Sequence, residues 1–338
     1  MKTTYRAMQI SKSGTLELVE RPIQVPGPRE VLIEVEACGI CGADVGDIEN
    51  PKSDLELPRV PGHEVVGRIV ATGSGVNPYW MVGQRVGVGR LGGHCNHCEA
   101  CRSGQFQLCR EQPFVGSTQD GGYAEMMIAR ATGLVSIPDG LKSQVAAPIL
   151  CAGIATFNAL KKSGAQAGDV IAVHGVGGLG HMAIQYAHKM GFKVVAIGRG
   201  KAISQQAIGL GAHIYIDSNE EDAAERLQAM GGARAILSTT TSSSTIASLL
   251  PTLSPQGRIM LLGFSHEPLA VPFGPMIAGE RSIMGSITGS PFENEKTLNF
   301  SMLSGVRPKI ETMPLEKANE AYQKMRSGEV EFRMVLTM

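Results

Sequence analysis

The segment GVGGLG at residues 175–180 constrains the fold of this chain more than any other stretch. It places Gly175, Gly177 and Gly180 in a G-x-G-x-x-G pattern, directly after the apolar run DVIAVHG and at the start of the helix-like run LGHMAIQYAHKMG. The first glycine permits a tight turn, the second lets the backbone approach a pyrophosphate, and the third lets helix and strand pack closely. The pattern alone also fits an ordinary turn between a strand and a helix, so the surrounding sequence decides its meaning.

Strand-like and helix-like runs alternate around this segment from about residue 143 onward. Strands are predicted at 169–175, 192–198, 212–217, 233–238 and 257–263, and helices at 179–191, 202–211 and from about 219. Strands that alternate with helices of this length predict a parallel sheet with crossover connections. In that setting the glycine motif, with Gly178 and Leu179 in its turn, is predicted to bind a dinucleotide.

The end of the second predicted strand distinguishes the two nicotinamide dinucleotides. An acidic residue there would hold the ribose hydroxyls of NAD, but this chain has Gly198, followed by Arg199 and Lys201. Two cations and no carboxylate suit a 2′-phosphate, so the sequence predicts NADP(H) in preference to NAD(H). The competing interpretation is that both cations are solvated loop charges.

The first 140 residues have a different character. Short runs that alternate apolar and polar residues, at 30–37, 65–72 and 122–129, are separated by glycine and proline turns. This pattern predicts β-strands in a barrel or sandwich-like domain. The tail, from about 290, contains a helix-like run at 314–328 and a strand-like run at 331–338.

Charge and hydropathy narrow the kinds of partner. The 338 residues include 31 Lys and Arg and 31 Asp and Glu, so no net field would attract nucleic acid or an acidic membrane. The first twenty residues lack the apolar core of a secretion signal, and we expect no later stretch to be apolar for long enough to cross a bilayer. We expect a soluble cytoplasmic protein that acts on a small molecule and has no nucleic-acid or membrane partner.

Four of the seven cysteines lie within CNHCEACRSGQFQLC. Cys95, Cys98, Cys101 and Cys109 form a C-x2-C-x2-C-x7-C series, which predicts a closed tetrahedral zinc site with a structural role. Because four thiolates complete the shell, His94 and His97 are predicted to be exposed loop residues.

Three further residues indicate a metal site only when they are considered together. Cys41 and Cys151 could each be small buried residues, and His63 a satisfied turn histidine. However, the motifs GICGAD, PGHE, the four-cysteine loop, DGGYAE, APILCAG and GVGGLG occur in this order. With them, the chain resembles the zinc-dependent medium-chain alcohol dehydrogenases over essentially its whole length.

This resemblance implies an α/β fold with two domains. A GroES-like, β-rich catalytic domain would span 1–150, with a structural zinc lobe at about 92–110. A Rossmann domain with a doubly wound parallel sheet would bind NADP(H) at 151–288, and 289–338 would complete the catalytic domain. The resemblance also implies a homodimer or homotetramer.

The resemblance further implies a second, catalytic zinc, which makes two per chain. Its ligands would be Cys41, His63 and Cys151, with the fourth position open to water or substrate and reached transiently by Glu64. Asp44 would hydrogen-bond the ligand histidine, and Arg333 would lie near the coenzyme pyrophosphate.

Two positions near Cys41 depart from the family pattern. Relatives that oxidise simple alcohols usually carry Ser or Thr, and often a histidine three residues later, where this chain has Ala43 and Gly46. The usual proton relay is therefore absent. Three routes stay open: a bridging water, which we favour, a shuttle through Glu64, or a natural reduction that obtains its proton elsewhere.

Arg90 stands where related sequences tend to place an aromatic side chain that lines the substrate pocket. Its guanidinium could select a substrate that carries a carboxylate or phosphate, or it could point to solvent, which we favour. Cys38 is predicted to be a small core residue beside the site.

The leading hypothesis is a zinc-dependent oxidoreductase that interconverts a primary or secondary alcohol and its aldehyde or ketone with NADP(H). One alternative is an NAD(P)H-dependent reductase of conjugated C=C or C=N bonds, for which the missing relay matters less. Another is a non-catalytic zinc- and nucleotide-binding redox sensor. The three ligands of the second site are all present, which disfavours the sensor.

Overall fold

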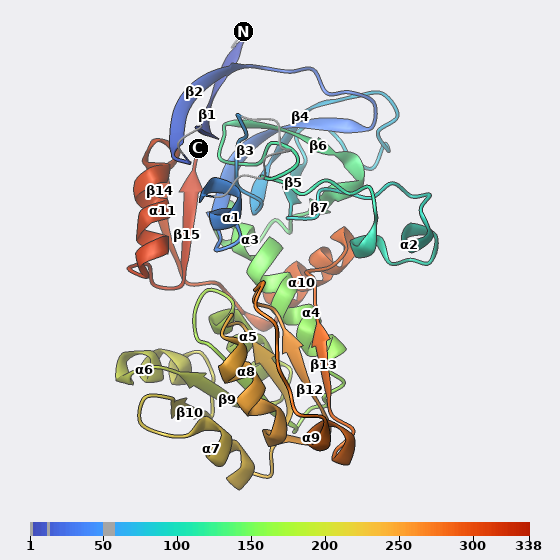
Figure 1. The fold of residues 1–338 in the computed structure, drawn as a ribbon. Coiled ribbons are helices and arrows are strands. Elements are labelled where there is room, and N and C mark those ends of the chain that lie inside the picture. Colours follow the sequence, from blue (N-terminus) through green and yellow to red (C-terminus); the bar gives the residue numbers. More distant parts are fainter. Residues whose placement is uncertain (1–2, 12–13, 50–57) are drawn as a thin grey trace. The chain divides into compact units, whose positions relative to one another are not determined.

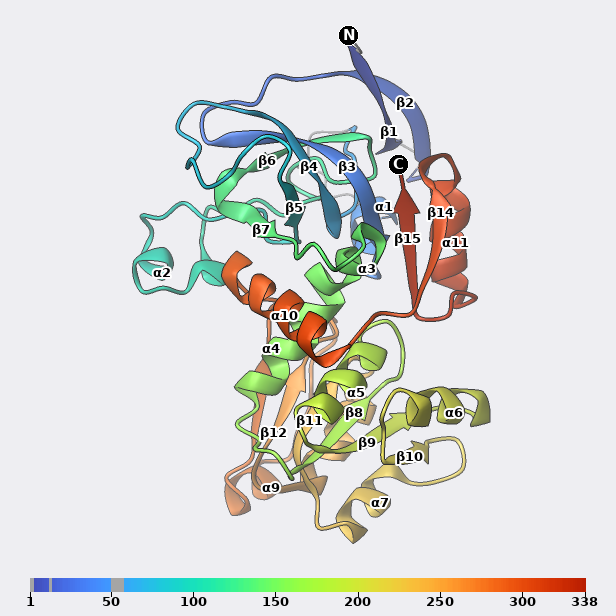
Figure 2. The same cartoon turned by 180° about the vertical axis from the view of Figure 1, so that it is seen from behind.

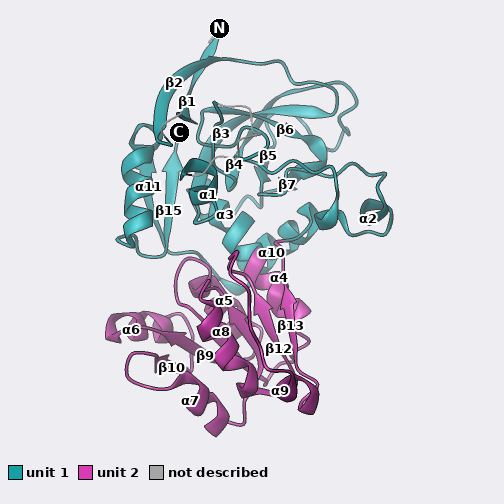
Figure 3. Cartoon of the chain, viewed as in Figure 1, with its two compact units in different colours: residues 1–154, 289–338 teal, residues 155–288 magenta. Residues whose placement is uncertain are grey.

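The computed structural model describes residues 3–11, 14–49 and 58–338, and these include every predicted site residue. It divides the chain into two compact units, residues 1–154 with 289–338 and residues 155–288 (Figure 3). The division falls after Ile154, within the unbroken helical segment Ser143–Lys162, whereas the sequence analysis placed it after residue 150. Cys151 therefore belongs to the first unit and not to the second.

The second unit is built on a six-stranded parallel sheet. Its strands are β8 (Val170–His174), β9 (Lys193–Gly198), β10 (Ile214–Asp217), β11 (Ala233–Ser238), β12 (Leu253–Leu261) and β13 (Ser282–Gly285). They lie in the order β10-β9-β8-β11-β12-β13, and every neighbouring pair is parallel. The order reverses direction between β8 and β11, which is where open parallel sheets bind ligands at the carboxyl ends of their strands. The predicted Rossmann fold is confirmed.

One helix leads into β8, and the others connect the strands of the sheet. These helices are α4 (Ile154–Lys162), α5 (Gly180–Lys189), α6 (Lys201–Gly209), α7 (Ala223–Ala229), α8 (Ser243–Leu249), η4 (Leu250–Thr252) and α9 (Phe273–Ala278). Figures 1 and 2 show α6 and α7 at the β10 edge of the sheet. The sequence did not predict α8, because its residues SSTIASL are rich in Ser and Thr, which favour caps and turns over helix interiors. Its Ile246 and Leu249 pack into the core of this unit.

The first unit contains a larger, mainly antiparallel sheet. Its strands are β3 (Glu30–Ile40), β4 (Val65–Thr72), β5 (Arg85–Val88), β6 (Met126–Arg130), β7 (Leu134–Ser136), β14 (Ile310–Pro314) and β15 (Arg333–Thr337). The order is β14-β15-β3-β4-β5-β7, with β6 paired to β3. The chain's last strand, β15, lies antiparallel to β3, so the C-terminal segment completes a sheet that the N-terminal residues begin. A separate hairpin pairs β1 (Thr4–Ile10) with β2 (Leu16–Pro22).

The helices of the first unit are mostly short. They are α1 (Asp44–Glu49), α2 (Glu99–Arg102), η1 (Phe106–Leu108), η2 (Ala131–Gly133), α3 (Ser143–Pro148), α10 (Pro291–Ser304), η5 (Leu315–Lys317) and α11 (Ala318–Ser327). The sequence analysis missed α10, although its start carries a signal: Ser290 and Glu293 form a capping box and Pro291 is the first helical residue.

The segment from Ser143 to Lys162 corrects one expectation. By length and composition alone, this helix is long enough and apolar enough to cross a membrane, whereas the sequence analysis expected no such stretch. However, 83% of its apolar window is buried inside the protein, which is the environment of a core helix. Its middle, η3 (Ile149–Gly153), widens into a π-helical turn that contains Cys151. Such turns occur frequently at functional sites.

Candidate metal centres and cofactor site

Three residues from separate motifs meet in the first unit. Cys41 follows the end of β3 and His63 precedes β4, and the pairing of Cys38 with Val65 brings these two strand ends together. Cys151 reaches the same place from the π-helical turn. The ligand atoms of these three residues and of Glu64 all lie within 4.8 Å of one another. The structure thus brings together the residues that were predicted to hold the catalytic zinc.

Asp44 orients the histidine of this group. Its Oδ1 lies 2.8 Å from His63 Nδ1, while its Oδ2 accepts hydrogen bonds of 2.9 Å from the Cys41 amide and from the Tyr123 hydroxyl. His63, Asp44 and Tyr123 are completely buried. Burial lowers the pKa of His63, but the Asp44 carboxylate outweighs this effect and raises the pKa to about 10. This carboxylate holds the ring in a fixed orientation, as outer partners of metal-bound histidines do.

The geometry of this group fits a zinc ion. The sulfur atoms of Cys41 and Cys151 are 3.8 Å apart, and a tetrahedral ion with Zn–S bonds of about 2.3 Å separates two sulfurs by about 3.8 Å. His63 Nε2 is buried and makes no hydrogen bond of good geometry among the described residues, although Cys41 lies close enough to raise the pKa of His63. A buried polar atom of this kind requires a partner, which a metal would supply. Two thiolates and an imidazole leave one of four positions open.

Glu64 lies beside these ligands and pairs with Arg333. The Arg333 guanidinium, at the start of β15, donates to Glu64 Oε1, and both side chains are buried. Burial raises the pKa of Glu64 to about 7, although Arg333 opposes the shift. A Cβ added to Gly39 would lie 1.9 Å from Glu64 Oε2, so this carboxylate fits only because residue 39 is glycine. The predicted contact between Arg333 and the coenzyme stays a prediction.

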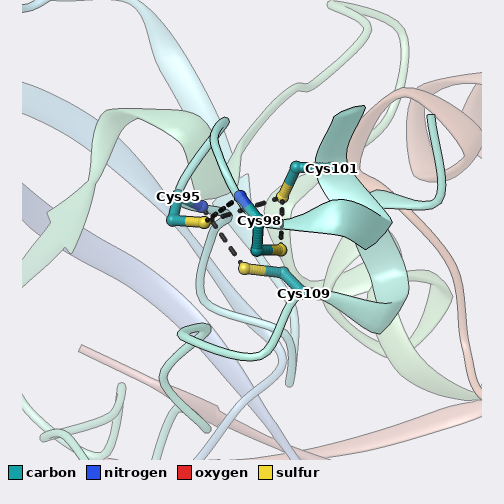
Figure 4. Close-up of side chains that lie close together, drawn as sticks. All are labelled: Cys95, Cys98, Cys101 and Cys109. Carbon is teal, nitrogen blue, oxygen red and sulfur yellow. Dashed lines mark hydrogen bonds between the residues drawn. The ribbon is translucent and has the colours of Figure 1, made fainter. Parts of the chain in front are cut away.

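The four cysteines of the loop converge around one point (Figure 4). The Cys98 and Cys101 sulfurs are 3.5 Å apart and those of Cys95 and Cys101 are 3.9 Å apart, again close to the spacing around a tetrahedral zinc. Backbone amides donate to two of the sulfurs: Cys98 N–H to Cys95 Sγ, and Glu111 N–H to Cys109 Sγ. Because amide donors favour thiolates, this closed group fits a structural zinc.

The two histidines of the loop differ in environment. His94 is half-buried, its ring 4.3 Å from that of Phe106, so the prediction that it is exposed was wrong. A neighbouring aromatic ring shields it from solvent, which the spacing of the cysteines could not indicate. His97 is exposed, as predicted.

The glycines of residues 175–180 have the properties that a dinucleotide turn requires. Gly175 has φ +97°, a conformation that side chains disfavour, and a Cβ on Gly180 would lie 2.0 Å from the Gly175 carbonyl oxygen. A Cβ on Gly177, by contrast, would meet nothing within 4 Å. The turn therefore keeps an open approach at Gly177, where a pyrophosphate could lie close to the backbone. Leu179 caps α5, and Gly178 precedes it in the same turn.

The β9–α6 turn presents the two predicted cations. Arg199 and Lys201 are exposed. Burial lowers the pKa of His174, at the end of β8, and the charge of Arg199 lowers it further, to about 4. The charge of Arg199 is thus felt by a residue at the carboxyl ends of the strands, where β8 ends. One carboxylate that the sequence analysis did not consider, Asp217, lies here as well, but both its oxygens accept from the Gly200 amide at 3.0 Å.

Comparisons with known proteins agree with this arrangement. Residues 27–139 match the family model of the alcohol dehydrogenase GroES-like domain, and residues 178–303 match that of the zinc-binding dehydrogenases. The chain is 40% identical to the alcohol dehydrogenase notN of Aspergillus sp. (strain MF297-2), over 99% of its own length and 98% of that protein. The chain belongs to the zinc-type medium-chain dehydrogenase/reductase family.

Two solved structures of similar proteins contain a nicotinamide cofactor. Acetophenone reductase from Geotrichum candidum, in complex with NAD, has 28% identity and a TM-score of 0.88, with 100% of this chain and 98% of that one covered. CAD from Helicobacter pylori, in complex with NADP(H), has 27% identity and a TM-score of 0.87, with 100% and 99% covered. The similar proteins thus include complexes with either cofactor.

The structure also locates the departures from the family's proton relay. Ala43 and Gly46 are exposed, and a Cβ added to Gly46 would meet nothing within 4 Å. Among the described residues, nothing therefore crowds the first side-chain atom that another residue would place at position 46. The surroundings are open to water.

Arg90 fits neither interpretation made from the sequence. Its guanidinium donates to both oxygens of Asp47 on α1, at 2.6 and 3.2 Å, and to the Val115 carbonyl. It does not point to solvent, since its side chain is only 21% exposed. Its charge is also matched by a carboxylate, which removes the reason to expect an anionic substrate.

Several contributors to the two sites were missed from the sequence. Tyr123, in DGGYAE, supports Asp44 from a position 79 residues away. Thr239 follows β11 and donates to the Gly175 carbonyl, and a Cβ on Gly175 would strike the Thr239 hydroxyl at 2.6 Å. A hydroxyl after a parallel strand beside the glycine turn was the available signal for Thr239.

Proposed function

We propose that this protein interconverts a primary or secondary alcohol and its aldehyde or ketone by hydride transfer with NADP(H), at a zinc held by Cys41, His63 and Cys151. The observation that carries the proposal is the convergence of the buried His63 imidazole and two sulfurs 3.8 Å apart, with all ligand atoms within 4.8 Å of one another. Three donors of this kind with one open position are a known catalytic set for zinc.

The side chains around the ligands have distinct tasks in this reaction. A zinc ion at the site supplies Lewis-acid stabilisation of the substrate oxygen. Asp44 keeps the His63 ring in place through Nδ1, and Tyr123 keeps Asp44 in place through its hydroxyl. Arg333 compensates the buried charge of Glu64, which lies close enough to the ligands to exchange with one of them.

The proton would leave through water near Ala43. Ala43 is exposed and carries no hydroxyl, and its neighbourhood leaves room for solvent. An ordered water can bridge polar groups at modest entropic cost.

The preference for NADP(H) is supported by the β9–α6 turn. Arg199 and Lys201 are free to approach a 2′-phosphate, because both are exposed, whereas Asp217 is engaged by the backbone. A guanidinium and an ammonium bind phosphate better than they bind a ribose hydroxyl. The Helicobacter pylori CAD structure shows that a protein of this fold can bind NADP(H).

A panel of neutral alcohols and aldehydes, assayed with both cofactors, tests the function. We expect turnover with a kcat/KM for NADPH above that for NADH, and two tightly bound zinc ions per chain, one at the first-unit group of Cys41, His63 and Cys151 and one at the four cysteines. Arg199→Ala should lower kcat/KM for NADPH by about tenfold or more and leave that for NADH nearly unchanged, since a charged hydrogen bond contributes about 1.5–3 kcal/mol. Glu267→Ala, an exposed change in the same unit, is the control.

Three results would contradict parts of this proposal. Equal or better use of NADH would reject the cofactor preference. Turnover confined to conjugated C=C or C=N bonds would replace the alcohol reaction with a reductase. Two zinc ions without turnover of any substrate would support a redox sensor instead.

We also propose a structural zinc at the four cysteines and residence in the cytoplasm. All seven cysteines are free thiols in the structure, and the spacing of the four fits a metal rather than disulfides. Unpaired thiols of this number persist in a reducing compartment.

Self-association is supported by exposed apolar side chains near one end of the second unit's sheet. β13 is its edge strand, and Met284 lies on it, while Phe273 and Ile277 of α9 are more than three-quarters exposed. We propose that copies of this chain cover these side chains in a homodimer or homotetramer. Sedimentation velocity measures this, and a monomer at micromolar concentration would contradict it.

A further inference from the structure

A third group of side chains of metal-ligating types shares Cys95 with the four-cysteine group. His97, two residues after Cys95, has its Nε2 3.0 Å from Glu111 Oε1. One ligand atom from each of Cys95, His97 and Glu111 lies within 4.8 Å of the other two. Cys95 and His97 lie at the start of the four-cysteine loop, and Glu111 lies two residues after its last cysteine, Cys109. The group therefore joins the two ends of the loop.

The imidazole is already held in the orientation that a metal requires. Its Nδ1 lies 2.9 Å from the Cys95 carbonyl oxygen. With Nδ1–H donated to this carbonyl, Nε2 faces the Glu111 carboxylate, to which its N–H donates at 3.0 Å in the absence of a metal. A cation that replaces this proton would bind both Nε2 and the carboxylate. Metal-bound histidines are commonly oriented in this way by a backbone carbonyl.

The donor set and its accessibility suit an ion from solvent. A thiolate, an imidazole and a carboxylate are all ligands of zinc. The side chains of His97 and Glu111 are 69% and 54% exposed, whereas Cys101 and Cys109 are only 5% exposed. A thiolate sulfur has lone pairs for two ions, so Cys95 can contribute to both groups.

We propose that Cys95, His97 and Glu111 form an additional binding site for a divalent ion of the zinc class, on the solvent side of the four-cysteine group. The ion would tie the start of the lobe to the residue that follows its end. This site is separate from the alcohol reaction and does not depend on it.

Equilibrium dialysis of the full-chain, zinc-loaded protein against micromolar free Zn2+ tests the site. Metal content per chain, measured by mass spectrometry, is expected to exceed the tightly bound content by one ion. His97→Ala and Glu111→Gln should each weaken this additional binding by at least about tenfold, the loss typical when a zinc site is impaired. The tightly bound zinc should stay unchanged.

Arg110→Ala is the matched control. It removes an exposed ion pair with Glu99 in the same lobe, at 3.3 Å, without touching the proposed ligands, and should bind the additional ion as the parent does. Equal uptake by the parent and His97→Ala would overturn the proposal. So would loss of the tightly bound zinc in His97→Ala, because His97 would then serve the four-cysteine group instead.

Discussion

Cys151→Ser is expected to lower kcat/KM by on the order of a thousandfold or more and to remove one zinc per chain. Cys151 provides one of the two sulfurs of the first-unit metal group, 3.8 Å from the other. A serine hydroxyl is a much poorer zinc ligand than a thiolate, so the metal's stabilisation of the substrate oxygen, worth several kcal/mol, would be lost. Steady-state kinetics and metal analysis of the same preparation measure both effects.

Ala43→Thr provides the contrast for this variant. Residue 43 is exposed, lies two residues from Cys41 and is not among the ligands of the metal group. The substitution therefore leaves all three ligands in place. The zinc content of this variant should match that of the parent. If its kcat and solvent isotope effect are also unchanged, proton transfer past residue 43 does not limit the reaction. Full activity of Cys151→Ser would show that this metal group is not the catalytic centre.

The two metal groups differ in how far the sequence could predict them. Cys95, Cys98, Cys101 and Cys109 lie within fifteen residues, so their spacing alone limits how far apart the sulfurs can be. The other group joins Cys41, His63 and Cys151, which are separated by up to 110 residues, and only the resemblance to a family connected them. The supporting positions of Gly39 and Tyr123 depend on contacts between strands and could not be inferred from either source.

The fold could likewise be predicted only where local sequence patterns determine the structure. Five of the six strands of the second unit were predicted because they are continuous apolar runs, and their parallel order followed from the helices between them. The sixth, β13, was missed, since its four residues Ser282–Gly285 are too short and mixed to form such a run. Helix α8 was missed, since a run of Ser and Thr is helical here only because Ile246 and Leu249 pack into the core. Arg90 was misinterpreted for a similar reason: its partner Asp47 lies on an element 43 residues away.

Cys101→Ser is expected to destabilise the first unit without abolishing its chemistry. Cys101 lies on α2, is 5% exposed, and its sulfur is within 3.9 Å of those of Cys95 and Cys98. Structural zinc contributes about 10–16 kcal/mol of binding free energy in small peptides, and this unit would lose a large part of that stabilisation. We expect the free energy of unfolding to fall by at least about 3 kcal/mol, which lowers Tm by roughly 6–12 °C in a domain of this size.

Cys38→Ser separates loss of zinc from loss of a buried thiol. Cys38 is completely buried and belongs to neither metal group, and burial raises the pKa of its thiol well above the ordinary value. Its replacement should cost stability through an imperfectly paired hydroxyl, about 1–3 kcal/mol, while the zinc content stays at the parent's value. Calorimetry with metal analysis distinguishes the two variants. If Cys101→Ser kept its full zinc content and the Tm of the parent, the four cysteines would not hold a structural metal, and their 3.5 and 3.9 Å spacings would need another cause.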